Sequence, residues 1–372
     1  MSEVSGAVKQ FTISINQQFP GGTLFLLLTD QEFKKFLMEM SNKMLEENAP
    51  SCRKHAACIV GRNQLEGGEP FWIFSEAVQI AGSGTLIEND DESPFLWLQH
   101  LVNGSNILLQ ESLRCAISTP LDHGQGITDL CLAVGAFMPE NFIAAMATMS
   151  AVVMGSNYSS ILKMFGCCGV PMLTGPPGSC KSEATKCALS PFGAHESHTC
   201  NNQTTPSYLF KAASKTTVPI YVDDVSEKSA DAWEELFIDA YNGSGRGTRL
   251  HGIETFQTLP IVSANWCIGT DRQRAHTRSI HIAFQHHEDE PEANLLFADM
   301  AQKRAVASKS VGELIKLSKR FEGADTKDII NRDICPSVIR ILSQFNAPAR
   351  FTTTMSIFMH FFLEVSIFHI AS

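Results

Sequence analysis

The sequence predicts an α/β protein whose middle part folds as a mostly parallel sheet flanked by helices. Three apolar runs predict buried strands of this sheet, at residues 169–174, 218–222 and 259–264. Helix-like stretches lie between the runs, as the crossover connections of a parallel sheet require. The first run leads into a glycine-rich turn, the second into a pair of carboxylates and the third into an asparagine. Polar or flexible residues therefore follow the end of each predicted strand.

Residues 1–128 predict an N-terminal α+β accessory domain without a catalytic pattern. Turn-forming clusters separate four strand-like segments, at residues 11–15, 23–28, 57–60 and 71–80. One helix is expected at residues 30–47, with Asp30 as its N-cap. A polar loop at residues 122–128 predicts the linker to the next domain.

Composition excludes several classes of protein. The 372 residues suffice for two or three domains, and 44% hydrophobic with 18% charged residues is typical of a globular chain. The net charge of −10 argues against a broad basic surface for nucleic acid, although a local basic channel stays compatible with it. The 11 cysteines contain no C-x-x-C pair, and no signal peptide is visible. We therefore expect reduced thiols and an intracellular location, cytoplasmic or nuclear.

Two long apolar stretches predict helices and no membrane partner. Residues 142–154 fall short of the roughly 20 residues that span a bilayer. Residues 355–371 are interrupted by Glu364 and two histidines, so a buried or amphipathic helix is the better interpretation. Because this second stretch reaches almost to the last residue, we expect a truncated C-terminus.

A phosphate-binding loop follows the first predicted strand. Its residues are Gly175, Pro176, Pro177, Gly178, Ser179, Cys180, Lys181 and Ser182. Small residues let backbone N–H groups surround a phosphate, and the following helix N-terminus adds partial positive charge. Lys181 would reach the β- and γ-phosphates of ATP, and the Ser182 hydroxyl would bind Mg²⁺. This is a Walker A loop in which Cys180 stands where a glycine is expected before the lysine.

An acidic pair follows the second strand. Asp223 is expected to hold Mg²⁺, and Asp224 to polarise the attacking water. An apolar run that ends in two acids is common by itself. Its position after Lys181, with a helix and a strand between them, favours the catalytic interpretation.

Polar residues at the third strand complete the predicted site. Asn265 is expected to contact the γ-phosphate or the water, from a strand that lies between the strands of Lys181 and Asp223. Arg274 and Arg278 precede a further strand at residues 279–284. In oligomeric ATPases an arginine in this region reaches the γ-phosphate bound by the neighbouring subunit, and the sequence favours Arg278 slightly over Arg274.

Residues 242–252 predict a flexible basic hairpin. Glycines alternate here with Arg246, Arg249 and His251. In a ring-shaped motor such a hairpin would contact a nucleic-acid backbone, whereas an exposed hairpin without a special function is the alternative. A basic segment in a chain of net charge −10 favours the first interpretation.

The order of these motifs resembles that of the additional-strand ATPases, which include AAA+ proteins and superfamily 3 helicases. Residues 142–178, 204–224 and 259–284 more closely resemble the uncharacterised helicase-like domain of phage, plasmid and other mobile-element proteins. The resemblance implies a P-loop NTPase core, ATP and Mg²⁺ as ligands, and nucleic acid as a partner. It also implies a homo-oligomeric ring.

The same resemblance assigns roles to individual residues and a domain order. Lys181 and Ser182 take the phosphate and metal roles, and the pair 223–224 takes the Mg²⁺ and water-polarising roles. Asn265 becomes the sensor of the γ-phosphate. The P-loop core is expected at residues 129–290, and residues 291–372 are expected to form a helical lid.

Two departures from the family pattern leave the function open. Cys180 replaces a glycine, and Asp224 is one methylene shorter than the usual glutamate. The first interpretation is an ATP-hydrolysing, helicase-like motor or remodeller that acts on nucleic acid. The alternatives are a nucleotide-gated binding or signalling module with weak or no hydrolysis, and a small-molecule kinase. Finally, His286 and His287, followed by three acidic residues, predict a solvated loop.

Overall fold

The computed structural model describes most of the chain from residue 112 onward and short segments before it. The described residues are 35, 55–57, 59–64, 68–75, 78–87, 95–97, 112–248, 252–266, 272–287, 292–345 and 347–371. Two compact units divide the chain. The first consists of Met1–Cys58 with Asn89–Ser112, and the second of Ile59–Glu88 with Leu113–Ser372. The domain boundaries expected at residues 128 and 290 both fall within the second unit.

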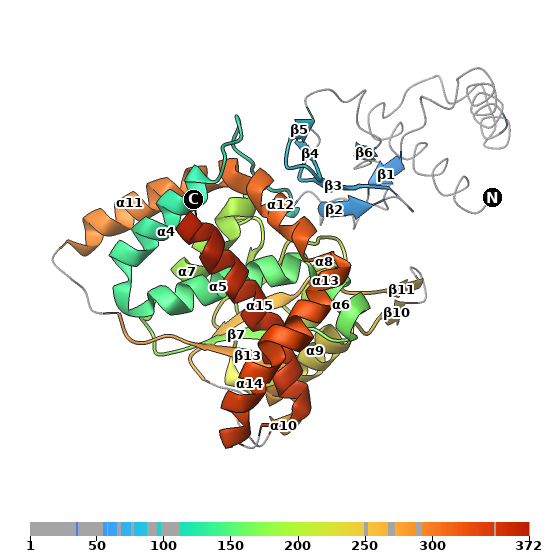
Figure 1. The fold of residues 1–372 in the computed structure, drawn as a ribbon, viewed down its shortest axis with the longest axis vertical. Coiled ribbons are helices and arrows are strands. Elements are labelled where there is room, and N and C mark those ends of the chain that lie inside the picture. Colours follow the sequence, from blue (N-terminus) through green and yellow to red (C-terminus); the bar gives the residue numbers. More distant parts are fainter. Residues whose placement is uncertain are drawn as a thin grey trace, which may run out of the picture. The chain divides into compact units, whose positions relative to one another are not determined.

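A five-stranded parallel sheet forms the centre of the second unit (Figure 1). Its strands are β7 (Val170–Thr174), β8 (Thr199–Cys200), β9 (Ile220–Val222), β12 (Pro260–Ala264) and β13 (Ser279–Ala283). Their order in the sheet is β13-β7-β12-β9-β8, and every pairing is parallel. The predicted α/β class is confirmed, and so is the expectation that the asparagine strand β12 lies between β7 and β9.

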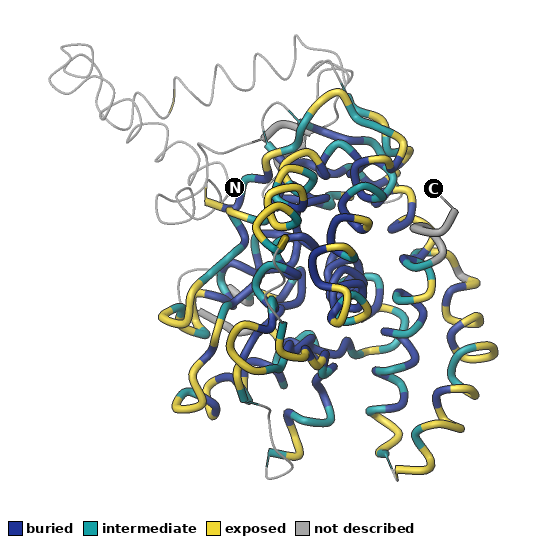
Figure 2. The backbone as a smooth tube through the Cα atoms, turned by 90° about the vertical axis from the view of Figure 1, so that its left-hand side faces the viewer, coloured by how far each residue is buried: buried dark blue, intermediate teal, exposed yellow. Residues whose placement is uncertain are grey.

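Helices cover this sheet, and the helix predicted at residues 142–154 is among them. They are α5 (Phe142–Ser156) after a 3₁₀ turn at Pro139–Asn141, α6 (Tyr158–Phe165), α7 (Lys181–Leu189), α8 (Pro206–Ala213), α9 (Ala230–Asn242) and α10 (Gln273–His276). Helix α5 is buried over most of its circumference and contacts β7, β12 and β13, while α9 contacts β7. Figure 2 shows the buried backbone, in dark blue, inside the unit and the exposed turns, in yellow, at its surface.

The segment predicted as a linker instead begins a helix. Helix α4 (Gln125–Phe137) starts inside residues 122–128. The Asp122 carboxylate accepts hydrogen bonds from the backbone N–H groups of Gly124 and Gly126, at 3.0 and 3.1 Å, and one from the hydroxyl of Ser310. The linker prediction was wrong because the polar residues satisfy the amino end of a helix.

Two further sheets come from residues before 112, one in each unit. An antiparallel sheet contains β2 (Gly61–Gln64), β3 (Pro70–Ile73), β4 (Gln79–Ala81) and β5 (Leu86–Ile87), and a parallel pair joins β1 (His55–Ala57) to β6 (Phe95–Trp97). The strand-like segment at residues 71–80 thus contributes to two antiparallel strands, and between them the backbone N–H of Phe74 donates to Val78 O at 3.0 Å. The predictions at residues 11–15 and 23–28 lie outside the described residues, as does the helix at 30–47 except for Lys35.

The solvated loop predicted at the two histidines after β13 was wrong for His287. Its side chain is 8% exposed, and its Nδ1 lies 2.5 Å from Glu140 Oε1. Glu140 and the Phe137 ring, 5.0 Å away, enclose the imidazole.

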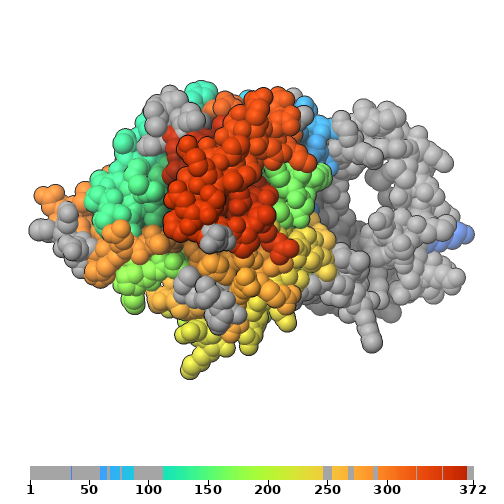
Figure 3. Space-filling view, turned by 60° about the horizontal axis from the view of Figure 1, so that its bottom comes forward, coloured from blue at the N-terminus to red at the C-terminus, as the bar shows by residue number. Residues whose placement is uncertain are grey.

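The C-terminal segment is helical, as expected. It contains α11 (Ala293–Val306), a 3₁₀ turn (Ala307–Ser310), α12 (Val311–Arg320), α13 (Ala324–Ile329), a π-helical turn (Ile330–Ile334), α14 (Cys335–Leu342), a 3₁₀ turn (Ser343–Phe345) and α15 (Ala349–Ala371). Figure 3 shows the last helices, in red, as one continuous surface. Within the described part of the chain, no single helix has the length and apolar composition to cross a membrane; α4 and Pro139–Ser156 meet both criteria only as a pair bent by 116°.

Candidate functional site

The 175–182 loop connects β7 to the amino end of α7. A Cβ atom at Gly175 would lie 2.6 Å from the carbonyl oxygen of Phe284, so only glycine fits there. Gly178 and Cys180 both have positive φ, at 75° and 61°. Cys180 therefore adopts the left-handed backbone that glycine takes most easily, at a cost of about 1 kcal/mol for a residue with a Cβ. The loop keeps a glycine-like path despite the substitution.

Lys181 occupies the centre of this loop. Its ammonium group donates to the carbonyl oxygens of Gly175 and Pro176, at 2.8 and 2.9 Å, and to Ser179 Oγ at 3.0 Å. A fourth bond, of 3.1 Å, reaches Asn265 Oδ1. Burial lowers the pKa of Lys181, and the nearby carboxylates of the acidic pair oppose this effect. The cation is thus held where the loop and the end of β12 meet.

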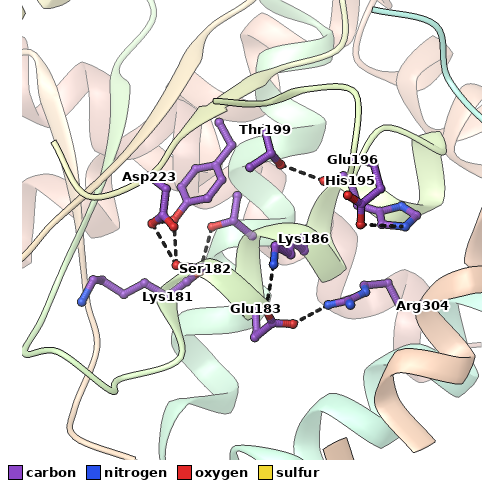
Figure 4. Close-up of polar contacts among 11 residues, drawn as sticks. Lys181, Ser182, Glu183, Lys186, His195, Glu196, Thr199, Asp223 and Arg304 are labelled. Atoms are coloured by element: carbon purple, nitrogen blue, oxygen red, sulfur yellow. Dashed lines mark hydrogen bonds and ion pairs between the residues drawn. The ribbon is translucent and has the colours of Figure 1, made fainter. Parts of the chain in front are cut away.

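Asp223 accepts hydrogen bonds from three hydroxyl groups, of which Figure 4 shows that of Ser182. Ser182 Oγ, Tyr221 OH and Ser263 Oγ lie 2.8, 2.6 and 2.9 Å from its Oδ1 atom. Burial, followed by the Asp223 charge, raises the pKa of Tyr221, which keeps the phenol protonated as a donor. Tyr221 and Ser263 were not among the predicted site residues. Their positions, two residues before Asp223 and Asn265 on neighbouring strands, are the signal that could have revealed them.

Asp224 and Asn265 meet at the carboxyl ends of β9 and β12. Asn265 Nδ2 donates to Asp224 Oδ1 at 2.8 Å, while its Oδ1 accepts from Lys181. The backbone N–H of Asp224 donates to Ser263 Oγ at 2.9 Å, and its φ of 50° turns the chain sharply at this point. Strained backbone of this kind concentrates at functional sites. One asparagine therefore links the loop lysine to the second carboxylate.

The groups at this site suit a phosphate and a magnesium ion. At Gly175 the absence of a side chain lets the backbone come close to a phosphate, and the Lys181 ammonium supplies a positive charge for it. Ser182 Oγ and the Asp223 carboxylate, 2.8 Å apart, are oxygen ligands of the type that Mg²⁺ prefers. The structure thus brings together five predicted residues from three segments: Lys181, Ser182, Asp223, Asp224 and Asn265.

The two predicted arginines are not part of this cluster. Arg278 directly precedes β13 and Arg274 lies in α10, at the amino-terminal edge of the sheet, whereas the cluster lies at the carboxyl edge. Arg278 is 9% exposed: its guanidinium donates to Arg274 O at 2.6 Å and stacks 5.4 Å from the Tyr241 ring. Arg274 is exposed, and with Arg278 and Arg350 it lines an open hollow of about 460 Å³.

The predicted hairpin at residues 242–252 is present as two short antiparallel strands. Strand β10 (Arg246–Thr248) pairs with β11 (Gly252–Glu254), and the hairpin projects from the core in Figure 1. Arg249 and His251 lie outside the described residues. The role of Arg246 and of these two residues in nucleic-acid contact stays a prediction.

Glu183 joins the loop helix α7 to the C-terminal helix α11 (Figure 4). Its carboxylate accepts from Lys186 at 3.0 Å and from Arg304. Burial alone would raise the pKa of Glu183, but the hydrogen bonds from Lys186 and Arg304 lower it below the usual value of 4.5. A charged contact therefore holds α11 to α7, the helix that follows the 175–182 loop.

This contact predicts a pH dependence of stability. Because the folded pKa of Glu183 is below that of the unfolded chain, its contribution is complete above about pH 4.5 and disappears as the pH falls through the folded pKa. At pH 7, Glu183→Gln is expected to lower the free energy of unfolding by about 1–2 kcal/mol. Urea titrations between pH 7 and 3 should show the two curves converging at acid pH. Equal stability at pH 7 would contradict the prediction, and the exposed Glu227→Gln is the control.

Comparisons with known proteins address the fold. No protein-family model matches the sequence, and no curated protein does. The solved structure of the active helicase Cch of SCCmec type IV is similar to 92% of this chain, with a TM-score of 0.57 and 14% identity. This chain spans 61% of that helicase. The NrS-1 C-terminal region matches 70% of each chain, with a TM-score of 0.29 and 11% identity. The JCV helicase matches 66% of this chain and 77% of its own, with a TM-score of 0.27 and 13% identity. Both resemble this chain too weakly to carry an argument. The second unit therefore has a helicase-like α/β fold.

Proposed function

We propose that this chain binds and hydrolyses ATP as a helicase-like motor or remodeller that acts on nucleic acid. The observation that carries the proposal is the contact between Lys181, Asn265 and Asp224 at the carboxyl edge of the sheet. A cation, an amide and a carboxylate placed within hydrogen-bond distance suit the γ-phosphate of a nucleotide and the water that attacks it.

Each residue has a defined task in this proposal. Lys181 exchanges its bonds to loop carbonyls for bonds to the phosphates, and Mg²⁺ held by Ser182 and Asp223 neutralises developing charge when bound. Asp224 orients the water and accepts its proton. Asn265 keeps this carboxylate in position by donating from Nδ2 and senses the γ-phosphate through the contact of its Oδ1 with the lysine.

The open hollow that Arg274, Arg278 and Arg350 line supports a multi-subunit assembly. Arg274 and Arg278 lie at the opposite edge of the sheet from the phosphate loop of their own chain, so their contribution would be to the site of a neighbouring subunit. Of the two, the exposed Arg274 is better placed than the buried Arg278, which the sequence favoured. The β10–β11 hairpin is the proposed contact with nucleic acid.

Cys180 favours the second function, a nucleotide-gated module with weak hydrolysis. Its Cβ and sulfur occupy the position where glycine lets the loop approach the phosphates, and its φ of 61° adds backbone strain. Both features would weaken nucleotide binding without changing the acidic pair. Turnover separates the two functions, because a gated module binds ATP with little hydrolysis.

The test is ATP hydrolysis by the full chain with Mg²⁺, with and without single-stranded DNA. We expect turnover that DNA stimulates, and its loss in Lys181→Ala but not in Lys228→Ala, an exposed lysine outside the site. ATP binding without turnover would replace the motor by the gated module. Absence of nucleotide binding would overturn both.

A further inference from the structure

The protein holds the Asp223 carboxylate by one of its two oxygens. Its Oδ1 atom accepts from Tyr221 OH at 2.6 Å, from Ser182 Oγ at 2.8 Å and from Ser263 Oγ at 2.9 Å. No hydrogen bond from a described residue reaches its Oδ2 atom. Asp223 is half-buried, and Oδ2 keeps contact with solvent. One oxygen is therefore fixed, and the other remains open to a ligand.

Two of the three hydroxyls approach Asp223 from the interior of the sheet. Tyr221 and Ser263 are both 0% exposed, they lie on the neighbouring strands β9 and β12, and their hydroxyl oxygens are 2.8 Å apart. Ser263 Oγ also accepts from the backbone N–H of Asp224 at 2.9 Å. The half-buried Ser182 is free to turn its hydroxyl toward a bound cation, whereas the two buried hydroxyls have no route to it.

A carboxylate that is fixed at one oxygen presents the other oxygen in a defined place. Exchange of the two oxygens of Asp223 by rotation of the side chain would break the bonds from Tyr221 and Ser263. Mg²⁺ requires oxygen ligands in a nearly octahedral arrangement, so it binds best to a ligand that is already oriented. Removal of a group that orients a metal ligand typically lowers metal affinity by about 10- to 100-fold.

We propose that Tyr221 and Ser263 are positioning residues for the cation that accompanies ATP, because they turn Asp223 so that Oδ2 faces Mg²⁺. Neither hydroxyl contacts the nucleotide, and both act through the carboxylate that they hold. This inference rests on the proposed function, since it assumes that the 175–182 loop binds ATP together with Mg²⁺.

Equilibrium binding of ATP to the full chain, measured once with Mg²⁺ and once with EDTA, tests these roles. Tyr221→Phe keeps the ring and removes only the hydroxyl. We expect its ATP affinity to fall by about 10- to 100-fold in Mg²⁺ and to stay unchanged in EDTA, and Ser263→Ala should behave in the same way. Because free ATP binds Mg²⁺ equally well beside either chain, the difference between the two conditions measures the cation affinity of the site.

Tyr158→Phe is the matched control. Tyr158 is also 0% exposed, and its hydroxyl donates to Ala240 O in α9. Both tyrosine variants lose a buried hydrogen bond, so thermal unfolding should detect a lower Tm in each, but only Tyr221→Phe should lose the benefit of Mg²⁺.

The two titrations also separate this inference from the proposed function. An equal Mg²⁺ effect in Tyr221→Phe and Tyr158→Phe, or an equal loss of affinity in Mg²⁺ and EDTA, would show that Tyr221 has only a structural role. Wild-type binding of ATP that Mg²⁺ does not strengthen would overturn this inference and leave nucleotide binding intact. Absence of ATP binding by the wild-type chain in both conditions would overturn the proposed function as well.

Discussion

Mixing Arg274→Ala subunits with Lys181→Ala subunits is expected to restore ATP hydrolysis that neither variant has alone. An arginine supplied by a neighbouring subunit contributes about 1,000-fold or more to turnover, so Arg274→Ala should lose about that factor. Its own phosphate loop is intact, and its ATP affinity should stay within about threefold of the wild-type value. In a random equal mixture, about a quarter of the sites combine an intact loop with an intact arginine.

The same experiment decides between the two arginines. Arg278 is packed against the Tyr241 ring and donates to Arg274 O, so Arg278→Ala should mainly destabilise the fold. Recovery of turnover with Arg278→Ala in place of Arg274→Ala would assign the role to Arg278, as the sequence favoured. A mixture that assembles and stays inactive in both cases would contradict the proposal that an arginine acts between subunits.

Replacement of Asp224 by asparagine is expected to lower kcat by about 100- to 10,000-fold, the range that general base catalysis contributes. The amide keeps the size of the side chain and an oxygen that can accept from Asn265, so the site should remain folded. It cannot take a proton from water. Affinity for ATP should change by less than about threefold, because the lysine and the Asp223 cluster are untouched.

Single-turnover kinetics and calorimetric titration with ATP would measure the two effects separately. Asp325→Asn, at an exposed position of α13, is the matched control and should leave both unchanged. Turnover at the wild-type rate in Asp224→Asn would show that another group activates the water. A loss of ATP affinity equal to the loss of turnover would mean that Asp224 supports binding rather than catalysis.

Much of the fold could be predicted because its signals are local. The apolar runs before Gly175, Asp223 and Asn265 became β7, β9 and β12, and helix α5 begins and ends close to the predicted residues 142–154. The linker and the strand at residues 71–80 were mispredicted, since hydrogen bonds at Asp122 and Phe74 decided those conformations. Local composition does not show which partner a polar group will find.

The residue types of the candidate site, and the strands that carry them, could be read from the sequence alone. Glycine, lysine, acid pair and asparagine each follow an apolar run, and parallel pairing of those runs is enough to bring their ends to one edge. The tertiary structure alone decided the contacts that depend on side chains far apart in the chain. Tyr221 and Ser263 meet at Asp223, and Arg304 reaches Glu183. Such contacts depend on packing distances that a pattern of residue types does not contain.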